Sequence, residues 1–186
     1  MTRDDILDAA AQVIRQKGFH GASMSDIAEA VNLQKASLYH HVSSKQEILL
    51  ALLDRALGML TEHIAAVASQ DLPADQKLRQ MIRAYLAALA DNSDLSNVLL
   101  FEHRSLDKKL HARHVPYRDK FEGIWRDVVN DGVRAGLFAE ADTGLVVRAL
   151  MGVMNWTLTW YRPDREYSID QIADQYADLL FDGMLK

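Results

Sequence analysis

The chain has 186 residues with a formal net charge of −5 at pH 7, and 49% of its side chains are hydrophobic. This size fits one modest domain, or a very small domain joined to a medium one, and the charge excludes DNA binding through overall positive charge. Three prolines and nine glycines are too few for an all-β protein, and no apolar run is long enough to span a bilayer. The absence of cysteine excludes disulfides and thiolate sites.

Two capping-box patterns mark the first helices. Thr2 with Asp5 and Ser23 with Asp26 place a hydroxyl at the start of a helix and a carboxylate three residues later. Gly18 lies where the apolar stripe of the first helix ends, and glycine is a natural helix stop. Apolar residues keep helical spacing throughout, so we expect an all-α protein.

A break at residues 32–33 separates the second short helix from a third over about 34–41, and a long helix follows over about 44–68. These elements predict a three-helix, helix-turn-helix DNA-binding domain over residues 1–46. Residues 47–186 are expected to form a second helical domain for effector binding and dimerisation. Its further helices are predicted at 74–91, 94–103, 107–113, 115–135, 142–162 and 168–185.

The third helix carries the side chains that would read DNA. In a helix-turn-helix, residues near the start of the second helix of the motif reach base edges, and flanking donors hold phosphates. Residues 1–50 contain five Lys and Arg against six Asp and Glu, so any DNA binding depends on where the charges lie. The candidates offered by this helix are Lys35, Ser37, Tyr39, His40 and His41, with Lys45 at the start of the long helix.

The run over residues 27–45, IAEAVNLQKASLYHHVSSK, resembles the signature of the TetR family of bacterial regulators, and Gly18, Phe19 and Ser23 match its spacing. The resemblance implies that Lys35 and Ala36 approach bases. It also implies that the DNA backbone is contacted by Ser23, Tyr39, His40, His41 and Lys45. Three residues depart from the pattern.

Asn32 replaces the turn glycine, but asparagine tolerates left-handed backbone well. Gln34 replaces a capping serine, and Val42 replaces a packing phenylalanine. None of these changes removes the chemistry of DNA reading. The competing interpretation is an ordinary helical hairpin, in a dimeric adaptor that binds no DNA.

Residues 102–120 reverse the sign of the chain's charge. They hold six Lys and Arg against three Asp and Glu, plus three histidines. This basic segment would attract an anionic ligand, although a solvated helical face would have the same composition. The adjacent histidines His40 and His41 point in different directions, and His103, His111 and His114 lack a carboxylate at matching spacing, so we expect no metal site.

Three segments, 102–104, 117–119 and 155–164, are similar to TetR-type regulators of lipid, steroid and acyl-coenzyme A metabolism. That similarity implies an acyl-CoA thioester or related lipid as effector, with its phosphates on basic residues and its acyl chain in an apolar pocket. A hydrophobic drug is the alternative, and plain core packing is the other role open to the apolar residues. Asn155 is the most suggestive, because a buried amide needs a partner. The candidates are Met81, Tyr85, Leu89, Leu99, Arg104, Arg118, Trp125, Met151, Asn155 and Trp156.

A helix-turn-helix protein usually binds pseudo-palindromic DNA as a dimer. The last two helices offer apolar surface for an intermolecular bundle, through Val147, Leu150, Met151, Met154, Ile172, Tyr176, Leu179, Leu180 and Gly183. No phosphate loop, nucleophile elbow or zinc motif predicts an enzyme, and no cofactor is expected. The N-terminus has no secretion signal, so we expect a cytoplasmic repressor that its effector releases from DNA.

Overall fold

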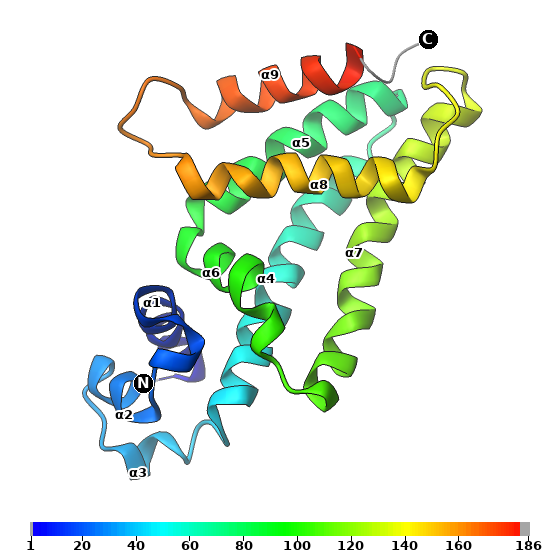
Figure 1. Cartoon of the computed structure of the whole chain (residues 1–186). Coiled ribbons are helices and arrows are strands. Elements are labelled where there is room, and N and C mark those ends of the chain that lie inside the picture. Colours follow the sequence, from blue (N-terminus) through cyan, green and yellow to red (C-terminus); the bar gives the residue numbers. More distant parts are fainter. Residues whose placement is uncertain (1, 183–186) are drawn as a thin grey trace. The chain divides into compact units, whose positions relative to one another are not determined.

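The computed structural model describes residues 2–182, which are mostly helical and contain no β-strand (Figure 1). The all-α prediction is confirmed. The helices are α1 (Arg3–Gly21), α2 (Met24–Ala30), α3 (Lys35–Leu38), α4 (Lys45–Ala68), α5 (Ala74–Asp91), α6 (Ser93–Asn97), the π-helical turn η1 (Val98–Glu102), the 3₁₀ turn η2 (His103–Ser105), α7 (Lys108–Arg134), α8 (Thr143–Trp160) and α9 (Ile169–Asp182).

The chain folds into two compact units. Unit 1 takes its described residues from Met1–Gly58 and Asn92–Arg118, and unit 2 from Met59–Asp91 and Asp119–Lys186. Helices α4 and α7 therefore supply residues to both units. Neither compact unit begins or ends between residues 46 and 47. The predicted boundary between a DNA-binding domain and an effector-binding domain at this point stays a prediction.

Both predicted capping boxes are present in unit 1. The backbone N–H of Asp5 donates to Thr2 Oγ1 (3.2 Å), and the N–H of Asp26 donates to Ser23 Oγ (3.1 Å). The carboxylates accept in return from the backbone N–H groups of Thr2 and Ser23. Hydrogen bonds from Lys17 and Ser23 hold the pKa of the Asp26 carboxyl well below its usual range. Gly18 has φ +70°, which breaks the helical path of α1 where the sequence predicts it.

The turn between α2 and α3 follows the expected backbone. Asn32 has φ +53°, and the N–H of Leu33 donates back to the carbonyl of Ala28 (2.8 Å). Leu38, the last residue of α3, and Val42, which follows the helix, are both buried. Regular helix ends at Leu38, before the predicted end at 41, because the next N–H groups bond three residues back and tighten the chain into a turn.

Three predicted helices are wrong in their bounds. The segments 107–113 and 115–135 form one helix, α7, which continues through Pro116. Proline removes one backbone hydrogen bond, but buried side chains on both sides of it, among them His114 and Phe121, hold the helix in place. The predicted helix over 94–103 is α-helical only to Asn97 and continues as the turns η1 and η2.

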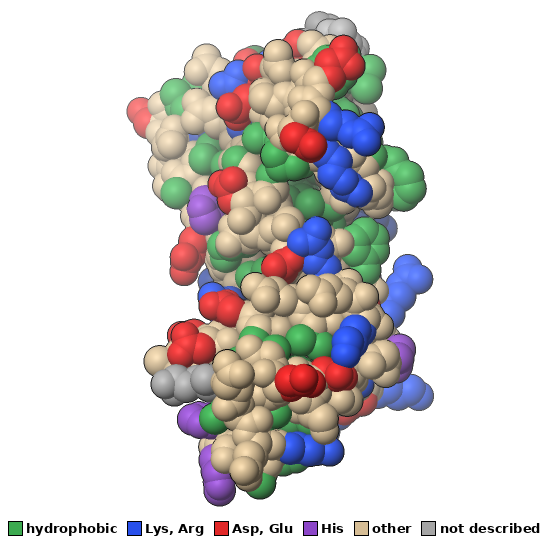
Figure 2. Space-filling model, turned by 90° about the vertical axis from the view of Figure 1, so that its left-hand side faces the viewer, with side chains coloured by type: hydrophobic (Ala, Val, Ile, Leu, Met, Phe, Trp, Pro, Cys, Tyr) green, Lys and Arg blue, Asp and Glu red, His purple; other side chains and the backbone are tan. Residues whose placement is uncertain are grey.

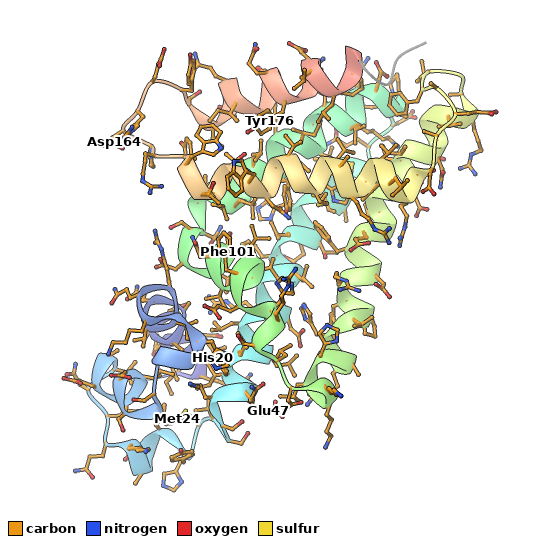
Figure 3. The ribbon with its side chains drawn as sticks, in the orientation of Figure 1. His20, Met24, Glu47, Phe101, Asp164 and Tyr176 are labelled. Atoms are coloured by element: carbon orange, nitrogen blue, oxygen red, sulfur yellow. The ribbon has the colours of Figure 1, made fainter. Side chains whose placement is uncertain are left out.

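Unit 2 packs α5 against α8 and α9. Arg79 and Arg83 of α5 donate to Asp178 (2.8 Å) and Asp174 (2.7 Å) of α9. Tyr176 lies between α8 and α9 (Figure 3), where its hydroxyl accepts from Thr157 Oγ1 (3.2 Å). The predicted final helix reached residue 185, and its last three residues lie outside the described part of the chain.

Candidate DNA-binding face and effector-binding residues

The helix-turn-helix of unit 1 presents most of its predicted DNA contacts to solvent. Leu38 anchors α3 from below, which turns the opposite side of the helix outward. Ser37 is half-buried, and the other side chains around α3 are exposed: Lys35, Ala36, Tyr39, His40 and His41. The structure thus gathers these six on or beside one short helix.

A hollow of about 320 Å³ adjoins this face, and Arg3, Tyr39, His40 and His41 are among its lining residues. Arg3 was not among the sequence candidates. Its guanidinium suits a phosphate, and only the packing of α1 beside the turn after α3 brings it there. The face of the molecule drawn in Figure 2 mixes acidic, basic and hydrophobic side chains without a large patch of one charge.

Lys45 and Ser23 are both engaged within unit 1. The Lys45 ammonium donates to the carbonyls of Phe19 (2.7 Å) and Ala22 (2.6 Å) and lies 4.5 Å from the centre of the Phe19 ring. The Ser23 hydroxyl donates to Asp26 Oδ2 (2.7 Å) while it caps α2. Each residue thus has a structural role, and its contact with phosphate stays a prediction.

We expect Lys45→Met to lower the free energy of unfolding by about 2 kcal/mol, because it leaves two partly buried carbonyls without their charged donor. Urea unfolding followed by circular dichroism measures the change. Lys35→Met is the matched control, since it removes an exposed ammonium and should change stability by less than about 0.5 kcal/mol. Equal stability of Lys45→Met and wild type would show that the contacts of Lys45 within the chain do not stabilise the fold.

The first turn of α4 is tied to the start of α7 within unit 1. Gln46 donates through Nε2 to the carbonyl of Ser105 (2.9 Å) and accepts at Oε1 from the N–H of Asp107 (3.0 Å). Arg113 pairs with Glu47 at 3.3 Å. Nothing in the sequence singles out Gln46, because a lone glutamine belongs to no recognisable motif and its hydrogen-bond partners lie about sixty residues away along the chain.

The histidines of the basic segment differ in their surroundings. His114 is buried, and its Nδ1 lies 2.8 Å from Asp54 Oδ1. Burial lowers the pKa of His103. Among residues 2–182, no three His, Asp or Glu side chains come together as metal ligands would.

Unit 2 brings together three of the predicted effector residues. The Tyr85 hydroxyl donates to Asn155 Oδ1 (2.6 Å), which is the partner that the amide needs. The Trp125 ring meets the Tyr85 ring edge-on, with 5.8 Å between centroids, and Phe121 lies 5.8 Å from Tyr85. Burial raises the pKa of Tyr85, so its hydroxyl keeps the proton that it donates.

The other effector candidates divide between the units. Met81 and Leu89 are buried in unit 2 and Met151 is half-buried, but Trp156 is 66% exposed and does not line the interior of the unit. Leu99, Arg104 and Arg118 belong to unit 1, where Leu99 is buried and both arginines are exposed. Their membership of one effector site stays a prediction.

The exposed side of α8 differs from the predicted dimer face. Val147, Leu150, Met154 and Ile172 are buried within their own protomer, so assigning them to the dimer contact was wrong. Gly183 lies outside the described residues. The exposed side instead carries an i, i+4, i+7, i+11 stripe of Leu145, Ala149, Gly152 and Trp156, named here the α8 stripe. Leu179 of α9 is also exposed, and Met151, Tyr176 and Leu180 are half-buried.

Both halves of the chain match known families. Residues 6–52 match the family described as bacterial regulatory proteins, tetR family, and residues 71–184 match the tetracyclin repressor-like C-terminal domain. The chain belongs to the TetR family. It is therefore a DNA-binding transcriptional regulator, as the pattern over residues 23–45 predicts.

Three similar proteins show how far the TetR likeness extends. The HTH-type transcriptional repressor KstR2 of Rhodococcus jostii (strain RHA1) is 28% identical over 98% of this chain and 90% of its own length. The fatty acid metabolism regulator protein of Bacillus subtilis (strain 168) is 24% identical over 96% and 93%. The crystal structure of AibR, in complex with isovaleryl coenzyme A and operator DNA, has 26% identity and a TM-score of 0.90 over 96% and 97%. No helix within residues 2–182 of this TetR protein has the length and apolar character to cross a membrane.

Proposed function

We propose that this TetR-family protein is a repressor that binds pseudo-palindromic operator DNA as a homodimer and leaves it when an acyl-CoA thioester binds. The observation that carries the effector part is the polar Tyr85–Asn155 pair, packed with Trp125 in the mostly apolar interior of unit 2. A core needs no such pair for stability. A ligand that combines an apolar chain with a polar group does need one. The complex of AibR with isovaleryl coenzyme A supports the same ligand class.

The DNA part of the proposal assigns roles to the exposed face of α3. Lys35, with Ala36 and Ser37 beside it, would read base edges in the major groove. Tyr39, His40 and His41 would hold phosphates together with Arg3. Ser23 and Lys45 hold the motif together and would meet the backbone only at their remaining exposed atoms. Such a regulator would act in the cytoplasm.

The dimer would form through the last two helices, with the α8 stripe at its centre. Ala149 and Gly152 are small, so two copies of α8 could approach closely, and Leu145 and Trp156 supply the apolar area at either end. A symmetric pair would place two α3 helices in successive major grooves about 34 Å apart.

Within unit 1, Arg104, Lys108, Lys109 and Arg118 are exposed, and such basic side chains suit an anionic group such as a phosphate. Helix α4 would carry the signal, because it supplies residues to both units and its first turn is held by Lys45 and Gln46. The effector must bind more tightly to the conformation that cannot bind DNA than to the conformation that can. The difference in binding free energy is typically about 1–3 kcal/mol.

Operator release tests the proposal. DNA selected from a random pool by the purified protein would be labelled, and its binding followed by fluorescence anisotropy during titration with octanoyl-CoA, isovaleryl-CoA, free coenzyme A, octanoate and hydrophobic drugs. We expect an acyl-CoA to weaken DNA binding about 5- to 150-fold and free coenzyme A to leave it unchanged.

The aromatic cluster of Tyr85, Phe121 and Trp125 would also suit a flat hydrophobic drug. Release by a drug and by no thioester would replace the acyl-CoA assignment and keep the repressor. Failure to select any DNA would overturn the regulator itself.

A further inference from the structure

The indole N–H of Trp125 is a buried hydrogen-bond donor without an acceptor. Trp125 is fully buried in unit 2, and no described residue accepts a hydrogen bond from its Nε1. A buried polar group left unpaired destabilises the fold, so such a group calls for an explanation. Of the chain's three tryptophans, Trp156 and Trp160 are 66% and 43% exposed and carry no such cost.

Aromatic rings pack around Trp125. The Tyr85 ring meets it edge-on, and Phe121 lies with 6.4 Å between ring centroids. The Tyr85 hydroxyl donates its hydrogen to Asn155 Oδ1 (2.6 Å) and makes no hydrogen bond with the Trp125 indole. The indole N–H is therefore available to an acceptor on a molecule that enters from outside.

The polar groups of this cluster are neutral. A neutral donor among aromatic rings can satisfy a neutral acceptor such as a carbonyl oxygen, but it cannot repay the desolvation of a carboxylate or phosphate. An acyl chain packed along the rings of Phe121 and Tyr85 would place a carbonyl within the same apolar surroundings. The site therefore favours an uncharged acyl group over a free acid.

We propose that Trp125 is a specificity-determining residue that donates its indole N–H to the thioester carbonyl oxygen of the effector. This assignment rests on the acyl-CoA effector proposed above and adds the atom that recognises it. The Tyr85–Asn155 pair then acts as a positioning contact, because its hydrogen bond holds the Tyr85 ring against the Trp125 indole. Octanoate, which carries a charge in place of the neutral carbonyl, should bind more weakly than octanoyl-CoA.

The test compares octanoyl-CoA with S-octyl-CoA, a thioether that has the same chain and nucleotide but no carbonyl. Isothermal titration should show wild type binding the thioester about 3- to 10-fold more tightly. Trp125→Phe removes the donor and should bind both compounds equally. Trp160→Phe is the matched control, since it removes an exposed indole, and it should keep the wild-type preference.

A second readout uses the wild-type protein and does not depend on the folding of any variant. In protein labelled with ¹⁵N at the three indole nitrogens, the Trp125 signal should move downfield when octanoyl-CoA binds and stay in place with S-octyl-CoA. Its assignment follows from its slow exchange with water, because Trp125 alone of the three is buried.

The outcomes separate this assignment from the proposed function. Equal binding of both CoA compounds by wild type, or an unmoved Trp125 signal, would overturn the role of Trp125 and leave the acyl-CoA effector standing. A preference that persists in Trp125→Phe would overturn it as well. If neither compound binds, the effector class is wrong and the assignment of Trp125 falls with it.

Discussion

Replacing Lys35 and Tyr39 together by alanine is expected to weaken operator binding by about 1000-fold or more while the protein stays folded and dimeric. Both side chains are exposed on or beside α3 and hold no buried contact that the fold needs. A base or phosphate contact typically contributes about 1–3 kcal/mol, and a dimer loses each contact twice. Fluorescence anisotropy with the selected operator measures the loss, and circular dichroism checks the fold.

The dependence of this binding on salt separates two roles for Lys35. If Lys35 neutralises a phosphate in each subunit, Lys35→Ala should reduce the slope of log K against log salt by about 2. If it reads a base edge, the affinity should fall and the preference at one base pair should relax. Lys77→Ala in α5 is the control and should change neither quantity. Unchanged affinity of the double variant would remove α3 from the DNA interface.

Gly152→Glu is expected to raise the dissociation constant of the dimer more than 100-fold. A Cβ at Gly152 meets no atom within 4 Å in its own protomer, so the substitution leaves the monomer's packing intact. In the proposed interface, the glycine lets two α8 helices approach, and two glutamates facing each other would add like-charge repulsion to the steric block. Sedimentation velocity over a range of concentrations measures the change.

Gly123→Glu is the matched control, because it lies in α7, where a Cβ also meets no atom within 4 Å. It should sediment as the wild-type dimer does. The Gly152→Glu monomer should bind a full operator far more weakly than wild type, since it presents one α3 at a time. A dimer of Gly152→Glu as tight as wild type would place the interface away from the α8 stripe.

Sequence reasoning worked where the physics is local. The capping boxes at Thr2 and Ser23 join groups three residues apart. Gly18 and Asn32 adopt a positive φ, which glycine and asparagine tolerate better than other residues. It failed at residue 114, where the predicted break lies inside the continuous helix α7, because buried neighbours such as His114 and Phe121 hold the segment in one helix. The error at Val147 and Leu150 had a related cause. An apolar stripe shows which side of a helix is buried, but not whether its own chain or a second copy buries it.

The amino-acid sequence by itself determined the all-helical fold, the turn between α2 and α3 and the side chains that α3 turns to solvent, because capping, turn geometry and helical periodicity depend on residues within a few positions of each other. Only the tertiary structure decided that Lys45 is held by Phe19 and Ala22, that Tyr85 meets Asn155 seventy positions away, and that Trp125 keeps an unpaired donor. These facts follow from packing between distant segments, and the pattern of one segment carries no record of what will lie against it.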